Sequence, residues 1–127
     1  KLSFYAYAGD GEQAKATLTQ LEDFLHKSGA DEVDQYKKLL RQARQIVAVY
    51  VDKDISMLPK LQRQAAATKD GADRGLLQFR IAKLSHYAGD EDQAEVYLNR
   101  AAKNLKNTAY SVIIDSALED HSVLERY

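Results

Sequence analysis

The sequence contains no cysteine and only one proline, Pro59, among its 127 residues. Without cysteine there can be no disulfide framework, no thiolate nucleophile and no zinc site built on sulfur ligands. The longest purely apolar run, residues 46–51, covers six residues. A helix that crosses a bilayer needs roughly 20. These absences exclude disulfide-stapled domains and cysteine-dependent enzymes, and they predict that no helix spans a membrane.

What the sequence does contain is typical of a soluble globular protein, with 45% hydrophobic and 29% charged residues. A chain of this length can bury a moderate core, so we expect a single domain over residues 1–127. No signal segment is apparent, and a cytoplasmic location is favoured. Because the sequence begins with Lys1 rather than methionine, we interpret it as a fragment or a processed form.

The charges are unevenly distributed, although the net charge is only -1. Residues 35–83 hold eleven Lys or Arg against four Asp or Glu, whereas the segments before and after them each carry a net charge of -4. A basic middle region can attract an acidic partner, but such a run can also be no more than a solvated surface. Both interpretations stay open from the sequence.

A short motif occurs twice: YAGDGEQA at 7–14 and YAGDEDQA at 87–94, an offset of 80 residues. In each copy the glycine can adopt the left-handed conformation that ends a helix, and the aspartate after it can cap the next helix. A glutamine three residues further on would complete a capping box. These residues are Gly9, Asp10 and Gln13 in the first copy and Gly89, Asp90 and Gln93 in the second. The motif predicts a tight corner between two helices, and two units of about 40 residues would fill the interval.

Apolar residues recur at spacings of three and four along the chain, which indicates amphipathic helices. We expect helical hairpins at about 1–29, 31–69 and 71–106, followed by a closing helix at about 108–126.

The region between the two motif copies is harder to interpret. A helix at 35–51 would have one apolar side, but its end, IVAVYV, is β-branched and could by itself form a buried strand. We favour a helix because no partner strand occurs elsewhere. In the next helix, Ser56 would be the cap and Pro59 would lie in the first turn, where its missing N–H costs nothing. The residues on the apolar side of 35–51 are Tyr36, Leu39, Leu40, Ala43, Val47 and Tyr50.

Around the corners the sequence resembles the tetratricopeptide repeat family, whose pattern sets small and apolar residues at fixed distances from the corner glycine. The residues that carry the resemblance are Ala82, Gly89, Ala94, Leu98 and Ala101 in the third hairpin and Tyr5, Gly9, Ala14 and Leu18 in the first. The resemblance implies an all-α fold, a right-handed α-solenoid of about three antiparallel helical hairpins with a C-terminal capping helix. It also implies binding without catalysis, in a concave groove lined by the first helix of each hairpin.

The resemblance also implies which side chains face that groove. Arg44 and Arg80 hold equivalent positions nine residues before their corners, which predicts a basic groove suited to carboxylates or phosphates. We therefore interpret the chain as a non-catalytic module that binds a protein or peptide segment. The basic groove favours an acidic segment. The residues expected at the groove are Arg44, Tyr50, Arg80, Lys83, His86 and Tyr87.

Two other functions stay open. The chain could be a peptide-sensing regulatory domain of a larger bacterial regulator, or its basic middle could bind nucleic acid, which the near-neutral net charge makes the less favoured hypothesis. An enzyme is the least favoured class, because no phosphate loop, nucleophile elbow or metal motif occurs. His26, His86 and His121 lie far apart in sequence without a chelating pair, so we expect no metal or cofactor. The oligomeric state is left open.

Overall fold

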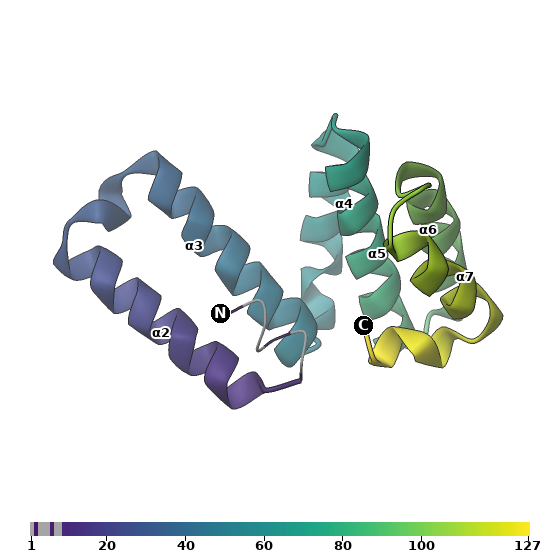
Figure 1. Ribbon diagram of the computed structural model, residues 1–127, viewed down its shortest axis with the longest axis horizontal. Coiled ribbons are helices and arrows are strands. Elements are labelled where there is room, and N and C mark those ends of the chain that lie inside the picture. Colours follow the sequence, from purple (N-terminus) through teal and green to yellow (C-terminus); the bar gives the residue numbers. More distant parts are fainter. Residues whose placement is uncertain (1, 3–5, 7–8) are drawn as a thin grey trace. The chain divides into compact units, whose positions relative to one another are not determined.

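In the computed structural model, residues 2, 6 and 9–127 are described. Their regular structure is helical, with no strand among these residues, and the helices follow one another through short turns (Figure 1). The predicted all-α class is therefore confirmed for this part of the chain. Tyr5, one of the residues that carry the family resemblance, lies outside the described residues. No described helix combines the length and the apolar character needed to cross a membrane.

The first of two compact units spans Lys1–Lys53. Within it, α2 covers Gly11–Lys27 and α3 covers Asp34–Ile46, and the two are joined by a short 3-10 helix, η1 (Ala30–Glu32). Gly29 lies between α2 and η1 with a φ of 73°, in the left-handed region that suits glycine. The two helices thus form a hairpin that turns at η1 (Figure 1).

The β-branched end of this unit remains helical. From α3 the chain continues directly into η2 (Val47–Val51), a π-helical turn in which the Asp52 N–H donates to the Val47 carbonyl at 3.0 Å. The prediction of a helix rather than a strand is therefore confirmed. Val47 and Val49 are buried, so tertiary packing maintains a helical backbone in residues of low helix propensity.

A buried cluster of Leu2, Ala43 and Val47 forms part of the core of the first unit, toward the C-terminal half of α3. Leu18 and Leu21 of α2 pack against this cluster. The cluster thus buries Ala43 and Val47 of the apolar side predicted for 35–51, whereas Tyr36 and Leu39 of that side are exposed. Ile46 and Val51 also pack against it.

The second unit, Asp54–Tyr127, contains four α-helices and ends with a 3-10 helix. Among its elements, α5 and α6 share the most extensive contact, and α4 and α7 pack against α5 and α6 respectively. The core contains Phe79, Leu98, Leu105, Ile114 and Leu124, all buried. The elements are η3 (Ile55–Met57), α4 (Leu58–Ala67), α5 (Gly71–Tyr87), α6 (Glu91–Asn104), α7 (Tyr110–Glu119) and η4 (His121–Glu125).

Both predicted corners have the expected backbone. Gly9 and Gly89 have φ values of 81° and 80°. The side chains of Asp10 and Asp90 then cap α2 and α6, each accepting the N–H of the glutamine three residues on, at 3.2 and 3.1 Å. The repeated motif therefore makes the same local structure twice, because both the glycine turn and the aspartate cap need only neighbouring residues.

The second half of the capping box differs at the second corner. The Asp90 N–H donates to the Ser85 carbonyl at 2.9 Å, as in a Schellman ending of the preceding helix. Gln93 therefore does not need to reach back to the cap. Its amide instead donates to the Ser85 hydroxyl at 2.8 Å and lies 3.4 Å from the Gln62 amide of α4. The Gln93 side chain on α6 therefore contacts α5 and α4 instead of capping its own helix.

After η2 the chain turns at Lys53, a residue other than glycine that nevertheless has a positive φ of 48°. Asp54, and not Ser56 as predicted, is the cap: its carboxylate accepts the Ser56 N–H at 3.1 Å and so begins η3. Helix α4 then starts at Leu58, and Pro59 lies in its first turn as predicted.

The predicted closing helix is interrupted. Helix α7 ends at Glu119, and Asp120 has extended backbone with a φ of -148°. The Asp120 carboxylate accepts the N–H of Ser122 at 3.0 Å, which starts η4 as a separate turn. Asp120 thus acts as a cap and redirects the chain, while Leu124 is still buried.

Candidate functional site

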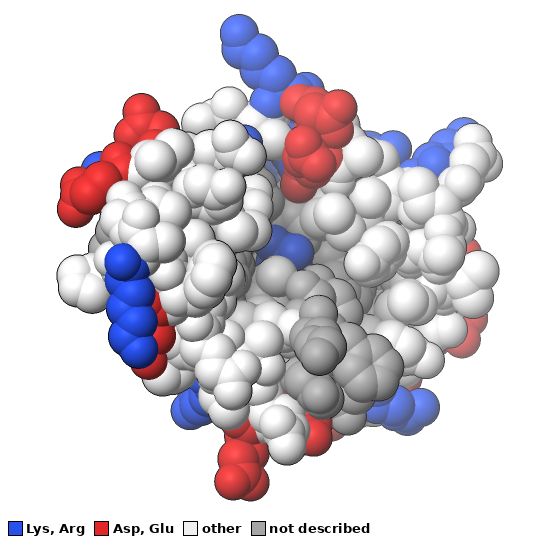
Figure 2. Space-filling view, turned by 60° about the vertical axis from the view of Figure 1, so that its left-hand side comes forward, with Lys and Arg blue, Asp and Glu red and all other residues white. Residues whose placement is uncertain are grey.

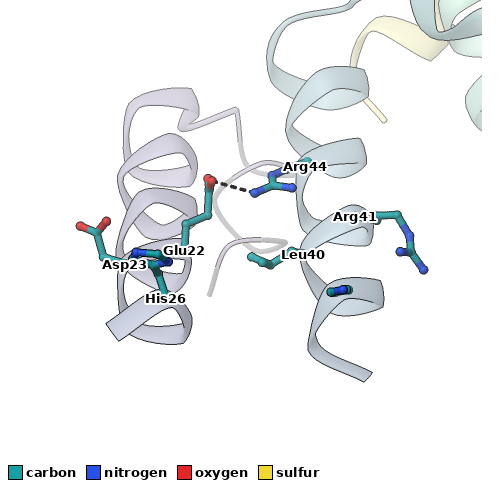
Figure 3. A pocket seen from close by; sticks show the side chains of 7 residues that line it. Glu22, Asp23, His26, Leu40, Arg41 and Arg44 are labelled. Carbon is teal, nitrogen blue, oxygen red and sulfur yellow. Dashed lines mark hydrogen bonds and ion pairs between the residues drawn. The ribbon is translucent and has the colours of Figure 1, made fainter. Parts of the chain in front are cut away.

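A pocket of about 530 Å³ lies between α2 and α3 in the first unit (Figure 3). One wall comes from the C-terminal half of α2 and the other from α3, while Leu40 supplies an apolar surface. The pocket exists because the buried cluster holds the hairpin together near Val47, whereas toward η1 the two helices carry long charged side chains. The lining residues are Glu22, Asp23, His26, Lys37, Leu40, Arg41 and Arg44.

The two walls of the pocket have opposite charge. Glu22 of α2 and Arg44 of α3 point toward one another and form an ion pair at 2.9 Å, whereas Asp23 and Arg41 point away from that pair (Figure 3). The basic wall continues with Lys37, whose ammonium group lies 4.0 Å from Glu32. Both ion pairs are solvent-exposed and so stabilise the fold only weakly. The α3 wall can therefore exchange these contacts for those of an anionic ligand at little cost.

Large apolar side chains are exposed on the same hairpin. Phe24 of α2 is 68% exposed, and Val33, Tyr36 and Leu39 at the start of α3 are also exposed. The sequence placed Tyr36 and Leu39 on the packing side of their helix, but the hairpin has no further element that covers them among the described residues.

Two of the six residues expected at the groove belong to this unit. Arg44 lines the pocket and pairs with Glu22. Tyr50 is buried in η2 and so contributes to packing.

The other four residues lie on α5 in the second unit. Lys83 is only 2% exposed; its ammonium group donates to the Leu124 carbonyl at 2.5 Å and lies 5.6 Å from the centre of the Tyr87 ring. The rings of His86 and Tyr87 are 5.7 Å apart. Arg80 is partly buried. The structure thus brings Lys83, His86 and Tyr87 together, beside the C-terminal segment of the chain.

The second unit also contains a cluster that the sequence did not predict. The carboxylate of Glu91, the first residue of α6, contacts His86 Nδ1 at 2.8 Å through one oxygen and His121 Nδ1 through the other. His86 Nε2 lies 3.4 Å from the carboxylate of Glu125. No spacing rule could have found this cluster, because only the fold of the second unit brings the end of α5 beside η4. Among the described residues, no three His, Asp or Glu side chains are arranged to hold a metal ion.

The cluster shifts the acidity of the groups around it. The pKa of Glu91 lies below its usual value, mainly because His121 donates a hydrogen bond to the carboxylate, and His86 acts in the same direction against the opposing effect of desolvation. The pKa of Tyr87 is raised, first by burial and then by the negative charge of Glu125.

The lowered pKa of Glu91 predicts how stability changes in acid. A carboxylate whose pKa is depressed by folding stabilises the folded state above its unfolded pKa, about 4.3, and this stabilisation is lost as the pH falls through the folded pKa. Glu91→Gln should therefore lose less stability than the parent between about pH 5 and pH 3 in thermal melts. Glu95→Gln removes an exposed carboxylate from the same helix and should follow the parent. Identical acid profiles for the parent and Glu91→Gln would contradict the assignment.

No family model, no curated protein and no solved structure matches the chain. The likeness to tetratricopeptide repeats therefore rests on the corner residues alone and stays a prediction.

Proposed function

We propose that the protein is a non-catalytic interaction module that binds an acidic segment of a protein partner at the pocket between α2 and α3. The observation that carries the proposal is the basic α3 wall of that pocket, with Leu40 among its lining residues. The hairpins would stack as a tetratricopeptide-like, right-handed solenoid, which the repeated corner motif supports.

The chemistry of the wall favours an acidic partner. Lys37 and Arg41 line the pocket and are exposed on α3, and an arginine guanidinium can hold a carboxylate through two parallel hydrogen bonds. Leu40, the apolar residue of the pocket lining, would contact an apolar side chain of the bound segment, removing it from water. A segment that alternates acidic and large apolar residues meets both requirements.

The charge pattern supports a protein partner more than a nucleic acid. Acidic and basic side chains are interspersed on the face shown in Figure 2, and neither sign covers that face. Nucleic-acid binding depends on several phosphates being neutralised at once, which requires a broad basic surface.

Charge reversal on α3 tests the proposal. Fluorescence anisotropy would measure the affinity for labelled peptides rich in Asp, Glu, Leu and Phe, with Lys- and Arg-rich peptides of the same length as the comparison. We expect the acidic peptides to bind, and the variant Lys37→Glu/Arg41→Glu to weaken their binding by about tenfold or more at low salt, because it turns two attractive contacts into repulsive ones. Arg44 is left unchanged, because a glutamate there would face Glu22.

A matched control separates the pocket from net charge. Lys60→Glu/Arg63→Glu makes the same charge change on exposed positions of α4 in the second unit. This variant should keep the parent's affinity. Equal losses of affinity in both variants would show that the effect comes from net charge and not from the pocket. Tighter binding of a single-stranded oligonucleotide than of any acidic peptide would favour the nucleic-acid function instead.

A further inference from the structure

The four side chains of the His–Glu cluster come from three elements of the second unit. His86 lies near the end of α5, Glu91 begins α6, and His121 and Glu125 belong to η4. The two imidazole rings are 6.5 Å apart and share the Glu91 carboxylate, one on each oxygen. Both histidine side chains are mostly buried, with 16% and 20% of their surface exposed. The cluster therefore links η4 to the corner between α5 and α6.

The geometry at His86 distinguishes its two protonation states. Both of its ring nitrogens lie against carboxylates, Nδ1 against Glu91 at 2.8 Å and Nε2 against Glu125 at 3.4 Å. A neutral imidazole carries one N–H and can donate to one of these carboxylates, so its bare nitrogen then faces the oxygen lone pairs of the other. A protonated imidazolium donates to both. The arrangement of side chains thus fits the protonated form.

The charge count leads to the same conclusion. With both histidines neutral, Glu91 and Glu125 place two negative charges around His86. With both histidines protonated, the four side chains of the cluster carry no net charge. Because like charges repel and opposite charges attract, the contacts of η4 with the corner strengthen when the histidines take up protons.

The other charged and titratable groups near the cluster do not supply the positive charge that protonation of the histidines provides. On α5, Tyr87 stacks edge-on against His86, and the Lys83 ammonium is engaged by the Leu124 carbonyl and lies over the Tyr87 ring. Beside η4, the pKa of Asp120 is lowered first by the hydrogen bonds from Ser122 and then by the charges of Arg126 and His121.

We propose that the His–Glu cluster is a proton-operated latch, which holds η4 on the corner between α5 and α6 while His86 and His121 are protonated and loosens as they lose their protons. Free histidine loses its proton near pH 6.5. Glu91 must stay ionised for the contacts to exist, so the latch holds in mildly acidic solution and loosens as the pH rises and the histidines lose their protons. The latch is independent of the pocket in the first unit.

Amide hydrogen exchange in the full chain tests the latch. The N–H groups of Val123 and Arg126 close the turns of η4 by donating to the Asp120 and Val123 carbonyls, both at 3.0 Å. After correction for the intrinsic rate, we expect their protection to fall about threefold between about pH 5.5 and 7.5, the scale of a partly exposed ion pair. The fall should follow the titration of the His86 and His121 ring protons measured by NMR in the same sample. Protection that does not change with pH would overturn the proposal.

Three substitutions make the test specific. Glu91→Gln should remove most of the pH dependence, since Glu91 contacts both histidines, and His86→Gln should remove part of it, since the contact between His121 and Glu91 remains. His26→Gln replaces the histidine that lines the pocket of the first unit and should leave the pH dependence of η4 unchanged. A parent-like pH dependence in Glu91→Gln, or its loss in His26→Gln, would also overturn the latch.

Discussion

Phe79→Ala is expected to lower the free energy of unfolding of the second unit by about 3–5 kcal/mol, the usual cost of truncating a buried phenylalanine. Phe79 is only 1% exposed and lies in the core where α5, α6 and α7 meet. Its ring packs edge-to-face against Tyr110 with the ring centres 5.8 Å apart, so the truncation removes an aromatic contact as well as apolar area. The cavity would open at the centre of the packed helices, where the structure can relax least.

Denaturant unfolding of the purified chain, followed by circular dichroism, measures this loss. Val112→Ala is the control, because Val112 lies on α7 but is 70% exposed, and it should change stability by less than about 0.5 kcal/mol. If the two compact units unfold separately, Phe79→Ala should shift only the transition of the second unit. Equal stabilities of the parent and Phe79→Ala would show that the packing around α5 is wrong.

Gly75→Ala is expected to destabilise the second unit by about 1–3 kcal/mol, the cost of overpacking a core. Helix propensity alone predicts the opposite sign, since alanine in a helix interior is better than glycine by about 1 kcal/mol. At Gly75, however, an added Cβ would lie 2.7 Å from the Leu105 Cγ and 2.9 Å from the Asn104 Cβ. The Asn104 Cβ is bonded directly to the backbone at the end of α6, and the Leu105 side chain is buried, so neither atom can move away as a flexible side-chain tip can. The clash should therefore outweigh the propensity.

Gly71→Ala in the same helix is the matched control. Its added Cβ would lie 3.5 Å from the Asn104 Oδ1, an ordinary contact, and we expect unchanged or slightly higher stability. If α5 and α6 approach one another as closely as the structure has them, thermal melts should show a lower melting temperature for Gly75→Ala and an unchanged or higher one for Gly71→Ala. A stabilised Gly75→Ala would mean that the two helices are farther apart.

The sequence by itself determined the local structure of this protein. The corners at Gly89 and at Gly9 were predicted because a left-handed glycine and an aspartate cap use only residues within one turn of each other. The all-α class and the approximate positions of the helices followed from the apolar periodicity. The continuation of α3 into η2 was also predicted, on the argument that no partner strand existed for its β-branched residues.

Small departures came from local interactions that compete with one another. Asp54 and Ser56 are both good caps, and the sequence could not show which of them the chain uses. Asp120 lies within the predicted closing helix, but its side chain caps the next turn and so divides that helix into α7 and η4. Such choices depend on the surrounding packing, which decides between conformations of similar free energy.

Only the tertiary structure decided the rest. It placed Lys83 in the interior, where its ammonium group holds the Leu124 carbonyl 41 positions further along the chain. It brought His86 and His121 onto opposite oxygens of Glu91, and it opened the pocket between α2 and α3. These contacts join residues distant in sequence, and their formation depends on how helix faces pack rather than on any pattern within one helix. A periodicity identifies the face that a helix buries, but the partner of that face, and the charged groups that meet at its edges, are settled only when the helices pack.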